Sequence, residues 1–198
     1  MSLSSNNMEL EQFQQKCTAV LRPELRENKG LEHFRDSKKN GNALEQLLDY
    51  LAVRGHLDRY MSAIDRRDFD EVADCFTVDA EIYTHITPGD LNSGAFRRGG
   101  AEFARAVRRL EKFKSTNHSI SNALITVDGP TATADCRVTA WLMGEFNGSD
   151  RVFLRCVHVI DDLVLTSEGW KISKRVHMPV IQFDVPASPI FMPHRNAS

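Results

Sequence analysis

The sequence predicts an α+β fold in which N-terminal helices pack on a strongly curved, mainly antiparallel sheet and leave a cone-shaped cavity. Two observations lead to this prediction. Apolar residues recur with the helical period between residues 44 and 64, and again between residues 101 and 113. From residue 118 to residue 183 the period changes to two, and turn signals separate a series of long strands.

The first helix of the domain is predicted from about residue 44 to Asp65. A capping box from Asp68 to Glu71 then begins a second, short helix that runs to Cys75. A Gly- and Asn-rich loop from residue 88 to 100 precedes a third helix over residues 101–113. The apolar face of the first helix is expected to comprise Leu44, Leu47, Leu48, Leu51, Leu57, Met61 and Ile64.

Five strands are predicted, and most of them are joined by tight turns. Asn147-Gly148 is a hairpin signal, and Asp128-Gly129-Pro130 and Ser167-Glu168-Gly169 mark two further turns. The predicted strands cover residues 81–86, 118–127, 132–145, 151–165 and 170–183.

Both ends of the chain differ from this domain, which we place at residues 43–184. Residues 1–42 are polar and form a predicted N-terminal extension that is partly ordered. Residues 185–198 contain three prolines and the apolar run Ile190 to Met192. We expect this tail to cover either the pocket or an interface.

The overall composition excludes several classes of partner. Of the 198 residues, 41% are hydrophobic and 26% are charged, and the formal net charge is -2. Such a balance gives no general attraction to nucleic acid or to anionic lipid. Charges interrupt the apolar stretches well short of a membrane span, and the acidic N-terminus lacks the pattern of a signal peptide. We therefore expect a cytoplasmic protein.

One pair of residues suggests chemistry. Asp65 lies in the last turn of the first predicted helix, and His118 lies on a strand beside Ile120 and Leu124. An aspartate that orients a histidine provides a general base without metal or organic cofactor. The alternatives are a solvated aspartate before a turn and a histidine satisfied within the core.

Other polar side chains are candidates for contact with a substrate. Tyr60 and Tyr83 are predicted to donate hydrogen bonds to a carbonyl or enolate, with structural tyrosines as the alternative. Arg175 is expected at the pocket rim or in a structural ion pair. The remaining substrate-binding candidates are His85, Asn122, Trp141, Cys156 and His158.

No metal or cofactor site is predicted. The four cysteines have neither CxxC nor zinc-finger spacing, and the chain contains no HExxH motif, EF-hand loop or glycine-rich phosphate loop. A three-histidine site formed by His85, His118 and His158 is a minor alternative.

The order of several motifs resembles the SnoaL-like branch of the nuclear transport factor two-like superfamily. These motifs are the helix that ends at Asp65-Arg66, the segment Cys75-Phe76-Thr77-Val78-Asp79-Ala80, Thr116-Asn117-His118-Ser119-Ile120, and the closing strand from Glu168 to Arg175. The resemblance covers about residues 44–183. Superfamily members include catalysts and plain binding modules.

The resemblance implies roles for particular residues. Scytalone dehydratase, the bile-acid dehydratase and a dehydrochlorinase of this superfamily place an Asp and a His as Asp65 and His118 are placed here. Tyr60 and Tyr83 resemble tyrosines of the bile-acid enzyme and of scytalone dehydratase, respectively. This chain departs from scytalone dehydratase at Ala140 and Cys156, where that enzyme has histidine and asparagine.

These observations favour a cofactor-independent lyase or isomerase, namely a dehydratase, double-bond isomerase or cyclase. Its substrate would be a small hydrophobic secondary metabolite, polyketides, terpenoids and polycyclic compounds included. The alternative is a non-catalytic module for small-molecule binding or assembly, and an accessory subunit is a weaker third option. We expect self-association through the open face of the sheet, with a homodimer first and a trimer second.

Overall fold

The computed structural model describes residues 43–85 and 94–187, so the N-terminal extension and most of the predicted tail lie outside the described residues. Helix α3 (Ala43–Arg66) and helix α4 (Phe69–Asp74) come first, followed by strands β1 (Phe76–Thr84) and β2 (Ala95–Arg98). Helix α5 (Gly100–Val107) continues into a 3₁₀ turn, η2 (Arg108–Lys112). Four long strands complete the order: β3 (Ser115–Asp128), β4 (Thr131–Phe146), β5 (Ser149–Thr166) and β6 (Gly169–Pro186).

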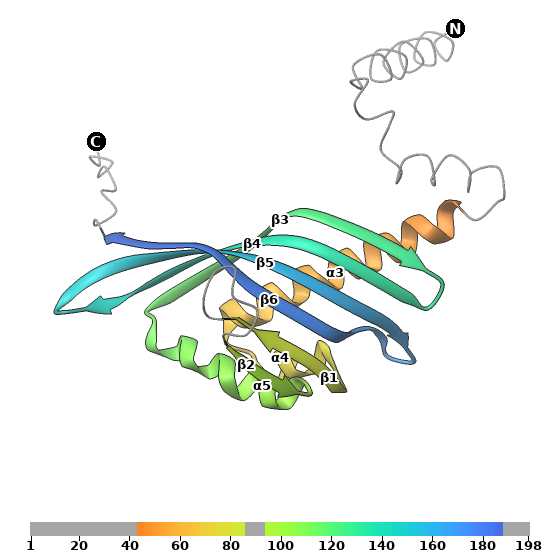
Figure 1. Cartoon of the computed structure of the whole chain (residues 1–198), viewed down its shortest axis with the longest axis horizontal. Helices are drawn as coiled ribbons and strands as arrows, with labels where there is room; N and C mark the ends of the chain where they lie inside the picture. The colour runs from red at the N-terminus through yellow and green to blue at the C-terminus, as the bar shows by residue number, and fades with distance from the viewer. Residues whose placement is uncertain (1–42, 86–93, 188–198) are drawn as a thin grey trace, which may run out of the picture. The chain divides into compact units, whose positions relative to one another are not determined.

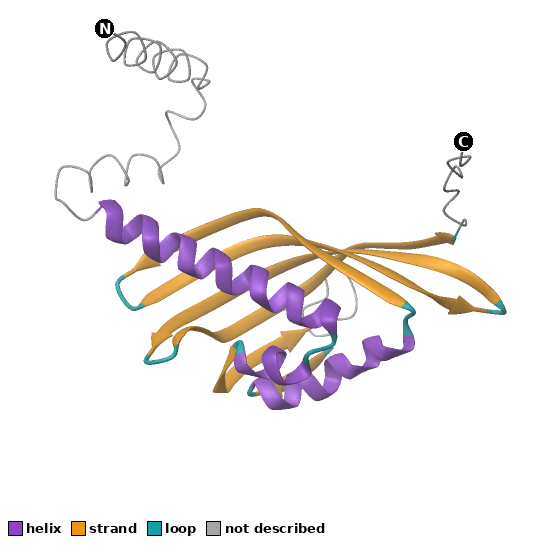
Figure 2. Ribbon diagram, turned by 180° about the vertical axis from the view of Figure 1, so that it is seen from behind, coloured by secondary structure: helices purple, strands orange, loops and turns teal. Residues whose placement is uncertain are grey.

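The strands form one curled, six-stranded sheet in the order β2-β1-β6-β5-β4-β3. All neighbouring strands are antiparallel except β1 and β6, which pair in parallel. Figure 1 shows the four long strands side by side, and Figure 2 shows the helices on one face of the sheet. This arrangement confirms the predicted α+β class and the antiparallel meander.

Local sequence signals account for the turns. Asn147 and Gly148 both have positive φ, 51° and 75°, as a two-residue hairpin turn requires, and they join β4 to β5. Asp68 caps α4, because its side chain accepts a hydrogen bond from the backbone N–H of Glu71 at 3.0 Å. The side chain of Glu71 does not complete the predicted capping box and instead pairs with Arg66.

Gly100 lies where the start of α5 meets the end of α4. A Cβ added there would lie 2.1 Å from the carbonyl oxygen of Ala73. Only a glycine permits this close approach, which lets the start of α5 pack against the end of α4.

The core lies between the helices and the inner face of the sheet. Along β4, the even-numbered residues from Ala132 to Gly144 are buried, and most of their odd-numbered neighbours are exposed. The buried side chains of α3 that join this core are Val53, Leu57, Tyr60, Met61, Ala63 and Ile64.

Several expectations about individual elements need correction. The buried part of α3 does not include its first leucines, and Leu44, Leu48 and Leu51 are each more than half exposed. β1 begins five residues earlier than predicted, and β2 lies inside the predicted 88–100 loop. β6 continues to Pro186, so the first residues of the predicted tail belong to the sheet.

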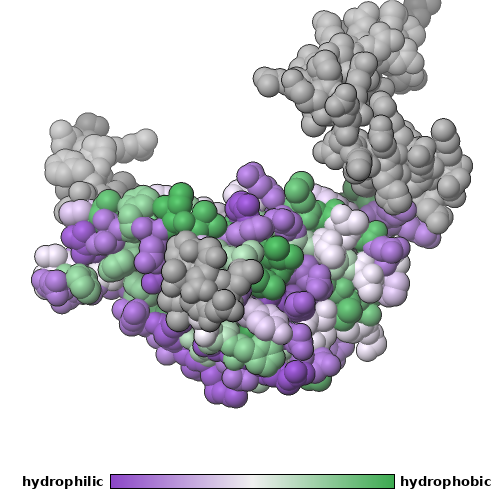
Figure 3. All heavy atoms as spheres, viewed as in Figure 1, coloured by the Kyte–Doolittle hydropathy of each residue, from purple (hydrophilic) through white to green (hydrophobic). Residues whose placement is uncertain are grey.

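The surface carries apolar as well as polar side chains. Figure 3 shows apolar patches between hydrophilic ones on the face with the long strands. Trp141, Ile181 and Phe183 are each about half exposed, and their strands β4 and β6 flank β5. Within the described part of the chain, no helix has the length and apolar character needed to cross a membrane.

Candidate functional site

Asp65 and His118 meet through direct hydrogen bonds, although 53 residues separate them in the chain. The last turn of α3 carries Asp65, and its Oδ1 lies 2.6 Å from Nδ1 of His118 on β3. Oδ2 of the same carboxylate accepts the backbone N–H of His118 at 2.7 Å. The carboxylate therefore fixes both the position and the ring orientation of His118.

The hydrogen bonds also fix the tautomer of the neutral imidazole. An ionised carboxylate only accepts hydrogen bonds, so Nδ1 of His118 must carry the proton that it shares with Asp65. The hydroxyl of Thr116 donates to Asp65 Oδ1 at 2.8 Å and completes a set of three donors around this carboxylate. Nε2 of His118 is then the nitrogen that is free to accept a proton.

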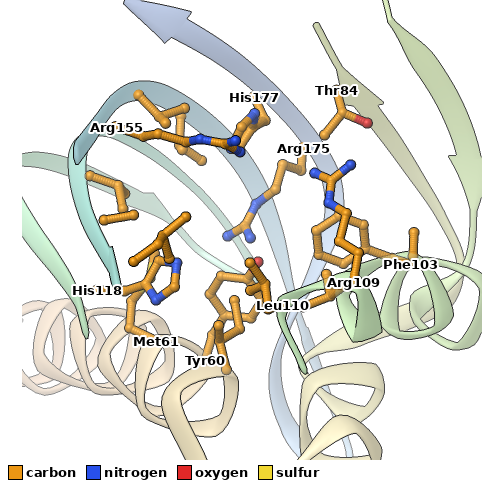
Figure 4. Close-up of a pocket in the computed structure, with 18 of the residues that line it drawn as sticks. Tyr60, Met61, Thr84, Phe103, Arg109, Leu110, His118, Arg155, Arg175 and His177 are labelled. Carbon is orange, nitrogen blue, oxygen red and sulfur yellow. The ribbon is translucent and has the colours of Figure 1, made fainter. Parts of the chain in front are cut away.

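His118 lines a pocket between the helices and the sheet. The cavity volume is about 100 Å³, and a single buried water needs roughly 10–15 Å³. Figure 4 shows His118, Tyr60, Arg109, Arg155 and Arg175 arranged around this hollow. Apolar side chains from α3, α5, β4 and β5 supply much of the wall, among them Ile64, Phe103, Val107, Val138, Leu142, Val157 and Val159.

Tyr60 and Arg175 lie next to each other in the pocket wall. The guanidinium carbon of Arg175 lies 4.1 Å from the centroid of the Tyr60 ring. Burial raises the pKa of Tyr60 to about 12, although the charge of Arg175 opposes this shift. The Tyr60 hydroxyl therefore stays protonated and remains a hydrogen-bond donor throughout the physiological range.

Arg175 forms a buried ion pair, one of the two roles that the sequence left open. It donates two hydrogen bonds to Asp161, at 2.7 and 2.6 Å. Burial is the largest single influence and disfavours the charge of Arg175, but Asp161, together with Tyr60 and Cys75, outweighs it and raises the arginine pKa above its usual value. The same guanidinium also forms part of the pocket wall.

Three other candidates do not line the pocket. Tyr83 points to the opposite face of β1 from Thr84 and donates a hydrogen bond to Glu81 at 3.3 Å. His85 follows β1, and its backbone N–H donates to the carbonyl of His177 at 2.9 Å. Asn122 has a φ of 49° at a bulge in β3 and is exposed.

The structure places Trp141, Cys156 and His158 on the outer face of the sheet. Val157 and Val159 line the pocket, so their neighbours Cys156 and His158 point the other way. His158 Nε2 lies 2.7 Å from Asp135 Oδ1, which gives the outer face a His–Asp pair of its own. Trp141 is 46% exposed and lies between the pocket residues Ala140 and Leu142. The side chains of β5 therefore point the opposite way from the prediction, which placed Cys156 and His158 in the pocket.

Sequence reasoning missed four basic pocket residues: Arg97, Arg109, Arg155 and His177. Arg97 was missed because it lies on β2, inside the predicted 88–100 loop, and the predicted 101–113 helix gave no signal that Arg109 faces the pocket. Arg155 was missed because the predicted pocket face of β5 was the one that carries Cys156 and His158. Only His177 had a usable signal, because it follows Arg175 at a spacing of two on β6.

The described residues contain no group of three or more His, Cys, Asp or Glu side chains placed to hold a metal ion. His85, His118 and His158, the three histidines of the minor metal hypothesis, do not share a site. His158 points to the outer face, and His118 lines the pocket.

Residues 45–176 match the family of SnoaL-like domains, and the chain belongs to this family. An uncharacterized protein from Mycobacterium tuberculosis is 30% identical over 141 residues, which cover 71% of this chain and 91% of the relative. A counterpart from Mycobacterium bovis matches to the same extent.

Solved structures share the fold at lower identity. A Kribbella flavida protein has a TM-score of 0.60 and 21% identity, and covers 69% of this chain and 93% of its own. A provisionally assigned scytalone dehydratase from Novosphingobium aromaticivorans has a TM-score of 0.57 and 22% identity, and the match covers 73% of this chain and 94% of that protein. A hexachlorocyclohexane dehydrochlorinase has a TM-score of 0.58 and 16% identity, and the match covers 74% of this chain and 98% of that protein. These likenesses establish the nuclear transport factor two-like fold, which hosts more than one activity.

Proposed function

We propose that the protein is a cofactor-independent lyase or isomerase that uses His118 as a general base. The observation that carries this proposal is the 2.6 Å hydrogen bond between Asp65 Oδ1 and His118 Nδ1 beside an open cavity. The side chains are 22% and 11% exposed, so the pair is sheltered but not sealed from the pocket.

The proposed reaction begins with a proton transfer to Nε2 of His118. The proton comes from a carbon next to a carbonyl group, or from a carbon next to one that bears a leaving group. The electron pair of the C–H bond forms a new double bond, and the leaving group departs with its own electron pair. Asp65 stabilises the imidazolium that forms, through the hydrogen bond already present.

Tyr60 is the candidate for the electrophilic role. With a pKa of about 12, it keeps its proton and can donate a hydrogen bond to a carbonyl oxygen or a departing hydroxyl group. Tyr83 has no such role in this proposal, because its hydroxyl donates to Glu81 outside the pocket. Dehydration, double-bond isomerisation and cyclisation all fit this pair of groups.

Two observations favour an enzyme over a binding module with the same fold. A module needs no contact between Asp65 and His118, yet the carboxylate makes two hydrogen bonds to this one residue. A module also tolerates a filled interior, whereas His118 borders free space. Two solved proteins with this fold carry the names of a dehydratase and a dehydrochlorinase, which agrees with an elimination reaction.

The proposal is tested by a liquid-chromatography mass-spectrometry screen of hydroxylated polyketides and terpenoids, in which loss of water appears as a change in mass and isomerisation as a change in retention time. We expect His118→Gln to lower turnover by about 10²–10⁴-fold, the usual contribution of a general base. His158→Gln is the matched control, since it removes the other His–Asp hydrogen bond, which lies on the outer face. Full turnover by a folded His118→Gln variant would contradict the proposal.

A further inference from the structure

We propose that the substrate of this pocket carries an oxyanion, such as a carboxylate, and that Arg97, Arg109 and Arg155 bind this group. The inference rests on the function proposed above, because it names the substrate class of the same site. It changes the expectation from a purely hydrophobic metabolite to an amphiphilic organic anion.

Three guanidinium groups converge on the pocket from three separate elements. Arg97 lies on β2, Arg109 in η2 and Arg155 on β5, and all three line the cavity. Arg109 and Arg155 are exposed and Arg97 is half-buried, so these arginines stand where the pocket meets solvent. Arg97 is held in place by a 2.7 Å hydrogen bond from its Nη1 to the hydroxyl of Thr84.

Within the described residues, the three pocket arginines have no carboxylate partner, unlike most of the other arginines described there. Among residues 43–85 and 94–187, no carboxylate forms an ion pair with Arg97, Arg109 or Arg155. The contrast is sharp between sequence neighbours, because Arg98 pairs with Glu81 and Arg108 pairs with Glu111. Other arginines outside the pocket that face a carboxylate are Arg54, Arg59, Arg66, Arg137 and Arg151.

The cluster concentrates positive charge around the cavity, and its members repel one another. Partial burial, followed by repulsion from Arg155 and Arg97, lowers the pKa of Arg109 below its usual value. Like charges gathered around a cavity raise the local potential and attract a group of opposite sign. The guanidinium group matches an oxyanion well, because it offers parallel N–H donors.

Arg175 does not add to this excess of positive charge. Asp161 neutralises it with two hydrogen bonds, and both side chains are almost completely buried. Likewise, Asp65 bonds His118 and forms no ion pair with any of the three arginines. The charge available to a ligand therefore comes from Arg97, Arg109 and Arg155.

His177 supplies a fourth polar group at the same wall. Its Nδ1 is buried and has no hydrogen-bond partner among the described residues. Burial, together with the charges of Arg175, Arg109 and Arg155, lowers the pKa of His177 to about 4, so its ring is neutral at physiological pH. A buried nitrogen without a partner carries a cost that a ligand or a water molecule removes.

The rest of the pocket defines the other half of the ligand. Val138, Leu142, Val157 and Val159 provide an apolar wall along β4 and β5. Such a wall favours a hydrocarbon or aromatic body, and the arginines at the mouth favour a charged end. Binding at both ends would orient the body of the substrate relative to Nε2 of His118.

The inference is tested with the full-length protein and two isosteric probes, 2-naphthoate and the neutral 2-naphthamide, by isothermal titration calorimetry. We expect 2-naphthoate to bind the wild type at least about 10-fold more tightly, as one or more charge-assisted hydrogen bonds would provide. This preference should shrink in Arg109→Gln and in Arg155→Gln. It should persist in Arg137→Gln, which removes a positive charge from the outer face of β4.

Equal affinity of the wild type for the two probes would overturn the inference, and so would an equal loss of preference in Arg137→Gln. The two arginine variants change exposed side chains, and thermal unfolding of each confirms that the fold is kept. His118→Gln separates this inference from the proposed function, because it should lose turnover and keep its preference for 2-naphthoate. A wild type that prefers the anion but turns nothing over would contradict only the proposed function.

Discussion

Arg175 and Asp161 form a two-point ion pair in which the side chains are only 2% and 1% exposed. The pair connects β6 to β5, and its arginine lies over the ring of Tyr60 in the pocket wall. Two charges at this depth are tolerated because each satisfies the other.

Removing one member of this pair should strongly destabilise the protein. We expect Asp161→Asn to lower the free energy of unfolding by roughly 3–5 kcal/mol, because it leaves the Arg175 charge buried without a counterion. Urea unfolding measures the change. Asp135→Asn is the control, since it removes a carboxylate of similar type from the half-exposed pair with His158, and it should cost about 1 kcal/mol or less. Equal stability of the two variants would contradict the structural role assigned to Asp161.

Asp65 should determine which nitrogen of His118 carries the proton. In the neutral ring of the wild type we expect Nδ1 to be protonated and Nε2 to be bare, which long-range ¹H–¹⁵N correlation spectra distinguish. Asp65→Asn can present its amide N–H to Nδ1 and so favour the opposite tautomer, which cannot act as the base. Turnover should then fall by about 10²-fold or more. A wild-type ring with a bare Nδ1 would disprove this assignment.

His56 should make the stability of the protein depend on pH. Its ring is buried beside the carbonyl oxygen of Cys75, at 2.9 Å, and burial lowers its pKa to about 4 from the ordinary 6.5. Between pH 6.5 and 4 the unfolded chain binds a proton at His56 that the folded chain does not, so the free energy of unfolding decreases as the pH falls.

The expected slope is about 1.4 kcal/mol per pH unit for each such histidine. His177, whose pKa is also about 4, adds to the slope over the same range. Unfolding by urea at several pH values should give a shallower dependence in His56→Gln than in the wild type. Identical slopes for the two proteins would show that His56 is not buried in the neutral form.

The sequence predicted the order of elements well, because helix and strand periods are local properties. Asp65 and His118 were paired on the resemblance to SnoaL-like proteins, because local periods alone leave a solvated aspartate and a core histidine as alternatives. The hairpin at Asn147-Gly148 was also predicted correctly, since positive φ at two adjacent positions restricts the choice of residue.

The pocket arginines were missed because charged residues are usually expected on the solvated surface, whereas tertiary contacts place these arginines around the pocket. In β5, Arg155 and Asp161 lie on the inner face with Val157 and Val159, whereas Cys156 and His158 point outward. Alternation alone allows either orientation, and the sequence analysis chose the one that places Cys156 and His158 in the pocket. Asp161 is buried because Arg175, on the neighbouring strand, provides its partner, and sequence periodicity contains no information about such pairings.

Deuterium exchange tests the central claim most directly for substrates whose proton lies next to a carbonyl group, because His118 can there return a solvent deuteron to the carbon before any later step. Substrates found in the mass screen are incubated in D₂O with the wild type, His118→Gln, and the double variant Asp65→Asn/His118→Gln, and NMR follows exchange at the activated carbon. We predict exchange with the wild type only, and no further loss when Asp65→Asn is added to His118→Gln. Exchange at the wild-type rate in a folded His118→Gln protein would contradict the assignment of His118 as the base.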